Sequence, residues 1–328
     1  MGRRSILALL RLLLMALVVT AVVVALVTSW EDVSPYLGAI SPGPLALAFL
    51  LTLIAPYATM LGWRTMLADL GSPLRQAPAA GVFFVGQLGK YVPGSIWAVI
   101  AQAEMGSRLG VPRRRVGVVG LLAIALALLT GGVIGLPALP VLLGRTELGG
   151  SAVVLVVVLL AVACYPPFVN AGIRRGLRLV RRQPLEHDLG GRSVLLTLVW
   201  FTFAWFVSGS AVLVVATDIA GLAPTRQVVL MCICGFALSA AFGMISVLFP
   251  AGFGIRDGVL ALILATSMPL AAAAAVAVVI RFLTIGVDVL VAAGGWAWGR
   301  RHDLLDSAPV PPTPTPAPSP PAGNGAGP

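Results

Sequence analysis

Two stretches of the sequence combine interrupted backbone with polar side chains inside otherwise apolar runs. The first, Gly86–Trp97, holds the only lysine of the chain, Lys90, and a helix-breaking pair, Pro93 and Gly94. The second, Phe249–Gly258, is rich in glycine and ends in charged residues. In a bilayer, interrupted backbone survives only beside a protein-lined cavity, because every N–H and C=O group needs a partner. Pro/Gly breaks at corresponding places in two halves of an apolar chain are typical of a transport site.

Lys90, Pro93 and Gly94 are candidate substrate-binding residues, because Lys90 and the helix expected after Gly94 can together bind an anion. The lysine brings a positive charge, and the free N–H groups at the helix start add to it. The alternative is a structural lysine that snorkels to the membrane surface or pairs with Glu104. Glu104 lies four residues before Arg108, in the order that favours an ion pair on one helix face. Glu104 is therefore a candidate for the site and also for a surface pair.

The second break offers Gly252, Gly254, Arg256 and Asp257 as candidate substrate-binding residues. Asp257 would lie in the first turn of a helix, where the helix dipole alone can explain a carboxylate. Arg256 has no such structural explanation. A charge inside a membrane is costly unless it is paired, so Arg256 is a functional candidate by default.

Arg281 lies near the expected midplane of the last apolar run. Asp288 follows seven residues later on about the same helical face, but roughly 10 Å away, which is too far for direct pairing. Arg281 therefore needs another partner. That partner is either a phosphate, which makes Arg281 a substrate-binding residue, or an acidic side chain from another helix.

The composition excludes an ordinary soluble domain and disfavours nucleic acid as a partner. The chain of 328 residues is 59% hydrophobic and 10% charged, with a net charge of +10, whereas soluble domains are about 25% charged. The basic residues lie between apolar runs, as in the cytoplasmic loops of membrane proteins. The sequence shows no Ser/His/Asp set, no carboxylate-rich metal cluster and no phosphate-binding glycine loop of the P-loop type. We expect no metal, no nucleotide cofactor and no enzymatic activity.

Apolar run lengths and arginine positions predict an all-α, polytopic membrane protein. A spanning helix needs about 20 apolar residues, and arginines mark cytoplasmic loops. The stretch 79–101 has basic residues near both ends, so it is expected to enter and return as a re-entrant hairpin of two half-helices. Residues 227–268 form either a second re-entrant hairpin, favoured because 258–268 is too short to span, or two crossings. Full spans are expected at 6–29, 44–67, 116–138, 151–170, 193–216 and 269–294.

This gives about six full spans and two Pro/Gly-broken re-entrant elements, which is eight helical membrane segments if each element counts once. Both termini are expected in the cytoplasm. Residues 1–305 form the predicted transmembrane domain. Residues 306–328 form a Pro-rich tail that cannot build a core and is expected to be disordered or polyproline-like.

The two broken stretches resemble the signatures of the lysylphosphatidylglycerol synthase transmembrane family, also called flippase-like. The first signature is matched by Gly89-Lys-Tyr-Val-Pro-Gly-Ser-Ile-Trp97, and the second, usually Pro-Gly-Gly-x-Gly-x-Arg-Glu, by Pro250–Asp257. Arg281 matches the arginine common in the closing helix of the family. Ala251 replaces the first glycine of the second signature, and aspartate replaces its glutamate. The resemblance covers about residues 5–300.

In that family the membrane domain, when fused to a soluble aminoacyl-transferase, moves aminoacylated phosphatidylglycerol across the bacterial membrane. Here a Pro-rich tail stands where the enzyme would be. The resemblance therefore implies a multi-pass protein of the bacterial plasma membrane that translocates a phospholipid or a lipid-linked anionic headgroup. The implied partners are the bilayer, that lipid and a separate lipid-modifying or glycosyl-transferring enzyme.

Two alternatives of other classes stay open. A membrane-embedded transferase acting on a lipid carrier would need a carboxylate such as Glu104 or Asp257 for turnover. A membrane scaffold would recruit a partner enzyme through the arginine-rich loop at 174–192 and the Pro-rich tail.

Overall fold

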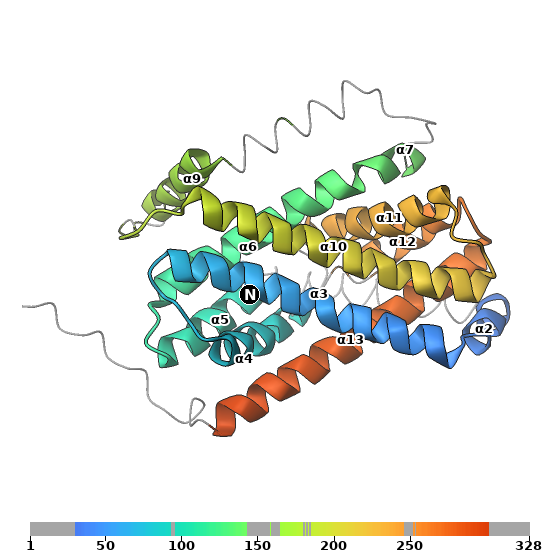
Figure 1. Ribbon diagram of the computed structural model, residues 1–328, viewed down its shortest axis with the longest axis horizontal. Coiled ribbons are helices and arrows are strands. Elements are labelled where there is room, and N and C mark those ends of the chain that lie inside the picture. Colours follow the sequence, from blue (N-terminus) through green and yellow to red (C-terminus); the bar gives the residue numbers. More distant parts are fainter. Residues whose placement is uncertain are drawn as a thin grey trace, which may run out of the picture.

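The computed structural model describes residues 30–92, 96–142, 158, 165–179, 181, 183, 185–245, 252 and 254–301. Their regular elements are all helical, in agreement with the all-α prediction (Figure 1). In chain order these are α2 (Trp30–Gly38), α3 (Pro42–Asp69), α4 (Gln76–Gln87), the 3₁₀ turn η1 (Leu88–Tyr91), α5 (Trp97–Arg108), α6 (Arg113–Gly135), the 3₁₀ turn η2 (Leu136–Ala138), α7 (Leu139–Leu142), α9 (Pro166–Leu179), α10 (Gly191–Ala220), α11 (Arg226–Ile245), α12 (Ile255–Leu264) and α13 (Leu270–Arg301).

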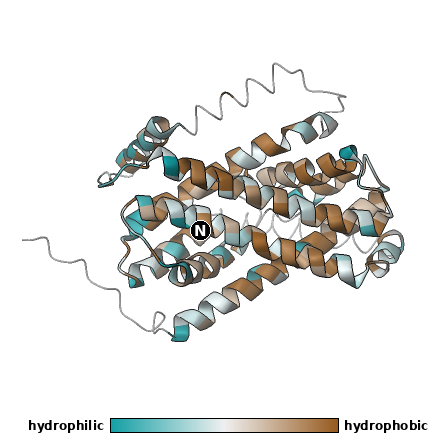
Figure 2. Cartoon of the chain, in the orientation of Figure 1, coloured by the Kyte–Doolittle hydropathy of each residue, from teal (hydrophilic) through white to brown (hydrophobic). Residues whose placement is uncertain are grey.

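Within this part of the chain, five helices are long and apolar enough to cross a membrane: α3, α6 continued by η2, α10, α11 and α13. Figure 2 shows apolar residues along these helices and hydrophilic residues gathered toward their ends. Four of them match the spans predicted at 44–67, 116–138, 193–216 and 269–294. The predicted span 6–29 and most of 151–170 lie outside the described residues, as does the tail 306–328.

The first broken element consists of α4, η1 and α5. The two helices pack on each other, α4 also on α13 and α5 on α6. Each has 12 residues, or about 18 Å of helix, which is too short for a hydrocarbon core of about 30 Å. Gly89 allows their close approach, since a Cβ there would lie 2.5 Å from the backbone nitrogen of Ala98. The two half-helices are therefore as expected, while Pro93 and Gly94 lie outside the described residues.

The second broken element, expected as either a re-entrant hairpin or two crossings, consists of two helices of unequal length. Its first arm, α11, has 20 residues, about 30 Å of helix, and is long enough to cross. The reason is that Arg226–Ile245 contains no proline and runs apolar throughout. Its second arm, α12, has only 10 residues and lies against both α11 and α13. The two elements are therefore unequal rather than mirror images.

Small residues set the close helix crossings that hold the bundle together. A Cβ on Gly295 of α13 would lie 3.3 Å from the Cα of Gly81 on α4. A Cβ on Gly209 of α10 would lie 2.5 Å from the Cα of Ile233 on α11. Helices in lipid gain little from apolar burial against each other, so such close backbone packing is a main source of their association.

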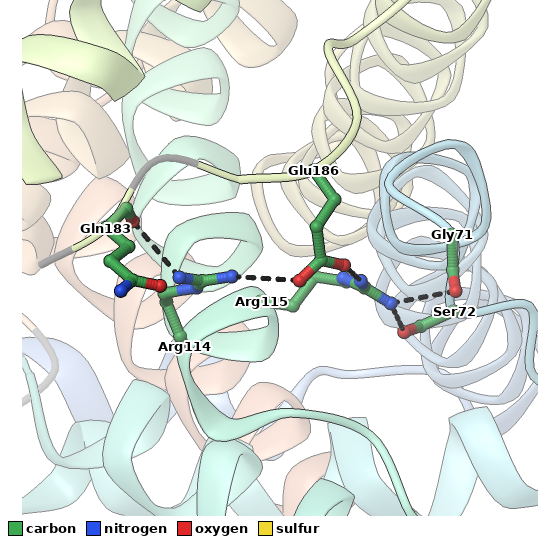
Figure 3. Close-up of polar contacts among 6 residues, drawn as sticks. All are labelled: Gly71, Ser72, Arg114, Arg115, Gln183 and Glu186. Carbon is green, nitrogen blue, oxygen red and sulfur yellow. Dashed lines mark hydrogen bonds and ion pairs between the residues drawn. The ribbon is translucent and has the colours of Figure 1, made fainter. Parts of the chain in front are cut away.

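Most of the described arginines gather at one end of the bundle, where α5, α9, the start of α6 and the end of α13 lie (left in Figure 1), whereas Arg226 begins α11 at the other end. Figure 3 shows how Arg115, which is 8% exposed, ties the loops of this end together. Its guanidinium donates to the carbonyl of Gly71 at 2.8 Å, to the Ser72 hydroxyl and to Glu186. Arg114 donates to the same Glu186 carboxylate at 3.2 Å. The loops after α3 and α9 are thus fixed to the start of α6.

Candidate functional site

A cavity of about 320 Å³ lies between the two broken elements. Its walls come from α3, α4, α5, α6, α10, α11, α12 and α13, and most of its surface is apolar. The polar side chains on its walls are Thr52, Thr59, Gln87, Lys90, Gln102, Ser208, Arg256, Thr284 and Asp288. An apolar cavity with a few converging polar groups is the usual form of a binding site.

One charged cluster on the cavity wall joins η1 to α13. The Lys90 Nζ atom lies 2.7 Å from the carboxylate of Asp288, and the Tyr91 hydroxyl donates to the same carboxylate oxygen at 2.5 Å. Asp288 is 6% exposed, while the Lys90 side chain keeps 32% of its surface accessible. Lys90 is thus paired, but with Asp288 rather than with Glu104.

Arg256, near the start of α12, is the second cation on the wall. Its guanidinium lies over the ring of Phe236 from α11, 4.7 Å from the ring centre. Among the described residues no carboxylate lies within 4.0 Å of it. Cation–π contact stabilises the charge without neutralising it. Arg256 therefore has no directly paired carboxylate among the described residues, and its hydrogen-bond donors line the cavity.

The backbone around Arg256 depends on glycine. Gly252, which lines the cavity, has φ +66°, and a Cβ there would lie 2.7 Å from the Cα of Gly243 on α11. Gly254 has φ +81° and forms the N-cap of α12. The glycines predicted as site residues thus shape the turn, and Gly252 also contributes to the wall.

Arg281 and Asp257 form an ion pair behind the cavity wall. The Arg281 guanidinium lies 3.9 Å from the Asp257 carboxylate, which also accepts a hydrogen bond of 3.3 Å from the Gly254 N–H. Of the two partners considered for Arg281, the acidic side chain from another helix is the one observed. Asp257 at the same time caps its helix, as the dipole argument allowed. Neither residue is among those that line the cavity.

Glu104 is not among the residues that line the cavity, and it forms a surface pair, which was the alternative considered for it. Its carboxylate accepts a bidentate pair of hydrogen bonds from the Arg113 guanidinium, each 3.0 Å long. Both side chains are about half exposed. The physical reason is the turn at Gly110, whose φ of +76° folds the start of α6 back beside α5. Arg113 therefore reaches Glu104 from the next helix, in place of the expected pair with Arg108.

Sequence reasoning missed Asp288 and Tyr91 as site residues. Asp288 was considered only as a partner of Arg281, from which it was correctly judged too distant. The signal that could have identified it was present, because an acid deep in an apolar span is itself a functional candidate. Tyr91 carried no signal of its own beyond its position next to Lys90.

Comparison with known proteins adds a family match. Residues 13–292 match the protein family described as lysylphosphatidylglycerol synthase TM region. The match contains both broken elements, the cavity and all of the long helices except the end of α13. No aminoacyl-transferase domain was found in the chain. No curated protein matches the sequence.

Proposed function

The chain belongs to the lysylphosphatidylglycerol synthase TM region family, and from this premise we propose that it translocates a phospholipid or a lipid-linked anionic headgroup across a bacterial plasma membrane. Family membership and five helices able to cross a membrane establish a multi-pass membrane protein with a lipid-related role. The translocation itself is our proposal.

The observation that carries the proposal is the charge of Arg256 in the cavity. Its guanidinium lines a mainly apolar cavity and has no carboxylate within 4.0 Å among the described residues. Arginine is suited to phosphate, since its planar fork can donate two parallel hydrogen bonds. A phosphate-bearing headgroup would thus find its counter-charge inside the bundle, while its acyl or prenyl tails stay in the bilayer.

The broken elements support movement of the headgroup across the bundle. Both elements line the cavity, the first with Lys90 and the second with Arg256. Interrupted helices at a substrate site are the typical moving parts of transporters, in which one half rocks against the other. We propose that relative movement of these two elements opens the cavity first to one side of the membrane and then to the other.

We propose that the arginine-rich end faces the cytoplasm. The described residues place Arg113–Arg115, α9 and the end of α13, with Arg300 and Arg301, at this end (Figure 1). The opposite end holds Glu31 and Asp218, whose carboxylate accepts a hydrogen bond from the Ser41 N–H. Arginines in short loops favour the cytoplasmic side. The C-terminal end of α13 is then cytoplasmic.

We further propose transport rather than catalysis as the activity. A transferase was expected to use Glu104 or Asp257. Glu104 is bound to Arg113 on the surface, and Asp257 is engaged by Arg281 and by the start of α12. If purified protein transferred a group to a lipid carrier, and the transfer were lost in Asp257→Asn while lipid binding persisted, the transferase alternative would replace this proposal.

The test is transbilayer movement of fluorescent lipids in proteoliposomes, with phosphatidylglycerol and a polyprenyl phosphate analogue as probes. We expect movement by the unaltered chain and a fall of about 10- to 100-fold in Arg256→Gln, because a charge-assisted hydrogen bond contributes about 1.5–3 kcal/mol. Arg113→Gln is the matched control, since it removes an arginine from the exposed pair with Glu104. Equal rates in Arg256→Gln and Arg113→Gln would contradict the role of Arg256.

A further inference from the structure

The charged groups on the cavity wall, together with the Arg281–Asp257 pair beside it, do not balance. Lys90, Arg256 and Arg281 bring three positive charges, and Asp257 and Asp288 bring two negative ones. The neighbouring segments 93–95, 246–251 and 253 contain no charged side chain in the sequence. The site therefore carries one excess positive charge within the part of the bundle that the structure describes.

We propose that Asp288 sets the charge selectivity of the site, so that it accepts headgroups with one net negative charge, of the phosphodiester class. The inference rests on the proposed translocation and specifies its substrate. A net charge in a region of low dielectric is costly, and a neutral assembly avoids that cost. One monoanion neutralises the excess charge. A zwitterion leaves the site positive, and a dianionic phosphomonoester makes it negative.

Asp288 is the residue that can hold this role because its carboxylate lies on the cavity wall. It contacts Lys90 and Tyr91, whereas Asp257 is engaged outside the wall by Arg281 and the Gly254 N–H. Asp288 thus pairs directly with Lys90, whereas no carboxylate of the described residues lies within 4.0 Å of Arg256. Without Asp288, both Lys90 and Arg256 would face the headgroup with their full charges.

Two variants test whether lipid selectivity depends on the net charge of the site or on one particular side chain. Asp288→Asn removes one negative charge while keeping an oxygen that can accept the Tyr91 hydrogen bond, so the excess rises to two. Lys90→Met combined with Asp288→Asn removes both members of the pair and returns the excess to one. The double variant should therefore regain the selectivity of the unaltered chain although it lacks both residues.

The experiment compares three fluorescent lipids in proteoliposomes of the full chain at pH 8: phosphatidylglycerol as monoanion, phosphatidic acid as dianion and phosphatidylcholine as zwitterion. We expect phosphatidylglycerol to move at least about tenfold faster than the other two, a ratio that corresponds to 1.4 kcal/mol. Asp288→Asn should shift the ratio of phosphatidic acid to phosphatidylglycerol by about tenfold or more toward phosphatidic acid. The double variant should reverse that shift.

A second measurement keeps this inference distinct from the proposed translocation. Binding of soluble short-chain versions of the same three lipids is measured on detergent-solubilised protein. One outcome is preferential binding of the monoanionic lipid that shifts in Asp288→Asn and returns in the double variant, without any transbilayer movement. This outcome would support the role of Asp288 and overturn the translocation. The role of Asp288 would be overturned if the unaltered chain, Asp288→Asn and the double variant all bound or moved the three lipids with the same preference. It would also be overturned if the double variant had the lipid preference of Asp288→Asn.

Discussion

At the scale of single residues, the two arginines near the second break have different surroundings. Arg256 faces the cavity and lies over an aromatic ring without a close carboxylate among the described residues. Arg281 is 8% exposed and is paired with Asp257. A sequence pattern cannot separate them, because both are arginines in apolar runs. We infer that Arg256 serves the substrate and that Arg281 holds α12 against α13.

This difference predicts a coupling between Arg281 and Asp257 in stability. Arg281→Met and Asp257→Asn should each lower the free energy of unfolding by about 1–3 kcal/mol, because each leaves a partner without its counter-charge. The combined variant should be less destabilised than the sum of the two, since neither charge is left alone. Thermal unfolding in detergent measures this. Strictly additive losses would show that the pair is not coupled.

The same combined variant also tests the earlier phosphate hypothesis for Arg281. If it regains stability, and its transport rate is close to that of the unaltered chain, Arg281 is structural. A stable variant that has lost transport would instead place Arg281 in contact with the substrate.

At the scale of elements, the turn before α12 is defined by backbone that only glycine adopts easily. Gly252 combines a positive φ with backbone contact to Gly243 of α11. The glycine–glycine contact therefore helps to position the start of α12, and with it Arg256, in addition to the Arg281–Asp257 pair. This explains how a short helix of 10 residues can present a charge deep inside the bundle.

Gly252→Ala is expected to destabilise the protein and to impair transport together. The positive φ alone costs about 1–2 kcal/mol for a residue with a Cβ, and the Cβ would also lie 2.7 Å from the Cα of Gly243. Gly258→Ala is the control, because no atom lies within 4 Å of its added Cβ. That change should be neutral or stabilise α12 by up to about 1 kcal/mol. A melting temperature equally unchanged in both variants would refute the role of Gly252.

Sequence reasoning predicted the helices well because their lengths follow from uninterrupted apolar runs. It also located the two breaks, since proline and glycine mark them. It failed for Glu104 because the i, i+4 rule considers one helix, whereas the turn at Gly110 brings Arg113 from the next. It did not foresee the Tyr91–Asp288 contact, which joins residues 197 positions apart. Such pairs depend on how helices pack, and that is decided by contacts such as Gly81 with Gly295.

At the scale of the whole molecule, the cavity and the arginine-rich end are separate features. Arg115 and Glu186 fix the loops at one end of the bundle, whereas the cavity lies between the broken elements. The fixed end and the long pair of α3 and α10, packed along each other, provide a frame. We propose that the shorter elements lining the cavity, α4, η1, α5 and α12, move within this frame.

Chemical labelling of Lys90 can report access to the cavity, because Lys90 lines the cavity and no other side chain in the protein carries a primary amine. An amine-reactive reagent that cannot cross membranes would label Lys90 only from the side to which the cavity opens. Labelling should be slow in the unaltered chain, where Asp288 holds the ammonium, and several-fold faster in Asp288→Asn. Arg113→Lys supplies an exposed lysine for comparison, and mass spectrometry reads both sites. If Lys90 of the unaltered chain were labelled as fast as the lysine of Arg113→Lys, the cavity and Asp288 would not shield it. Slower labelling of Lys90 would let this side chain report the opening of the cavity without any engineered tag.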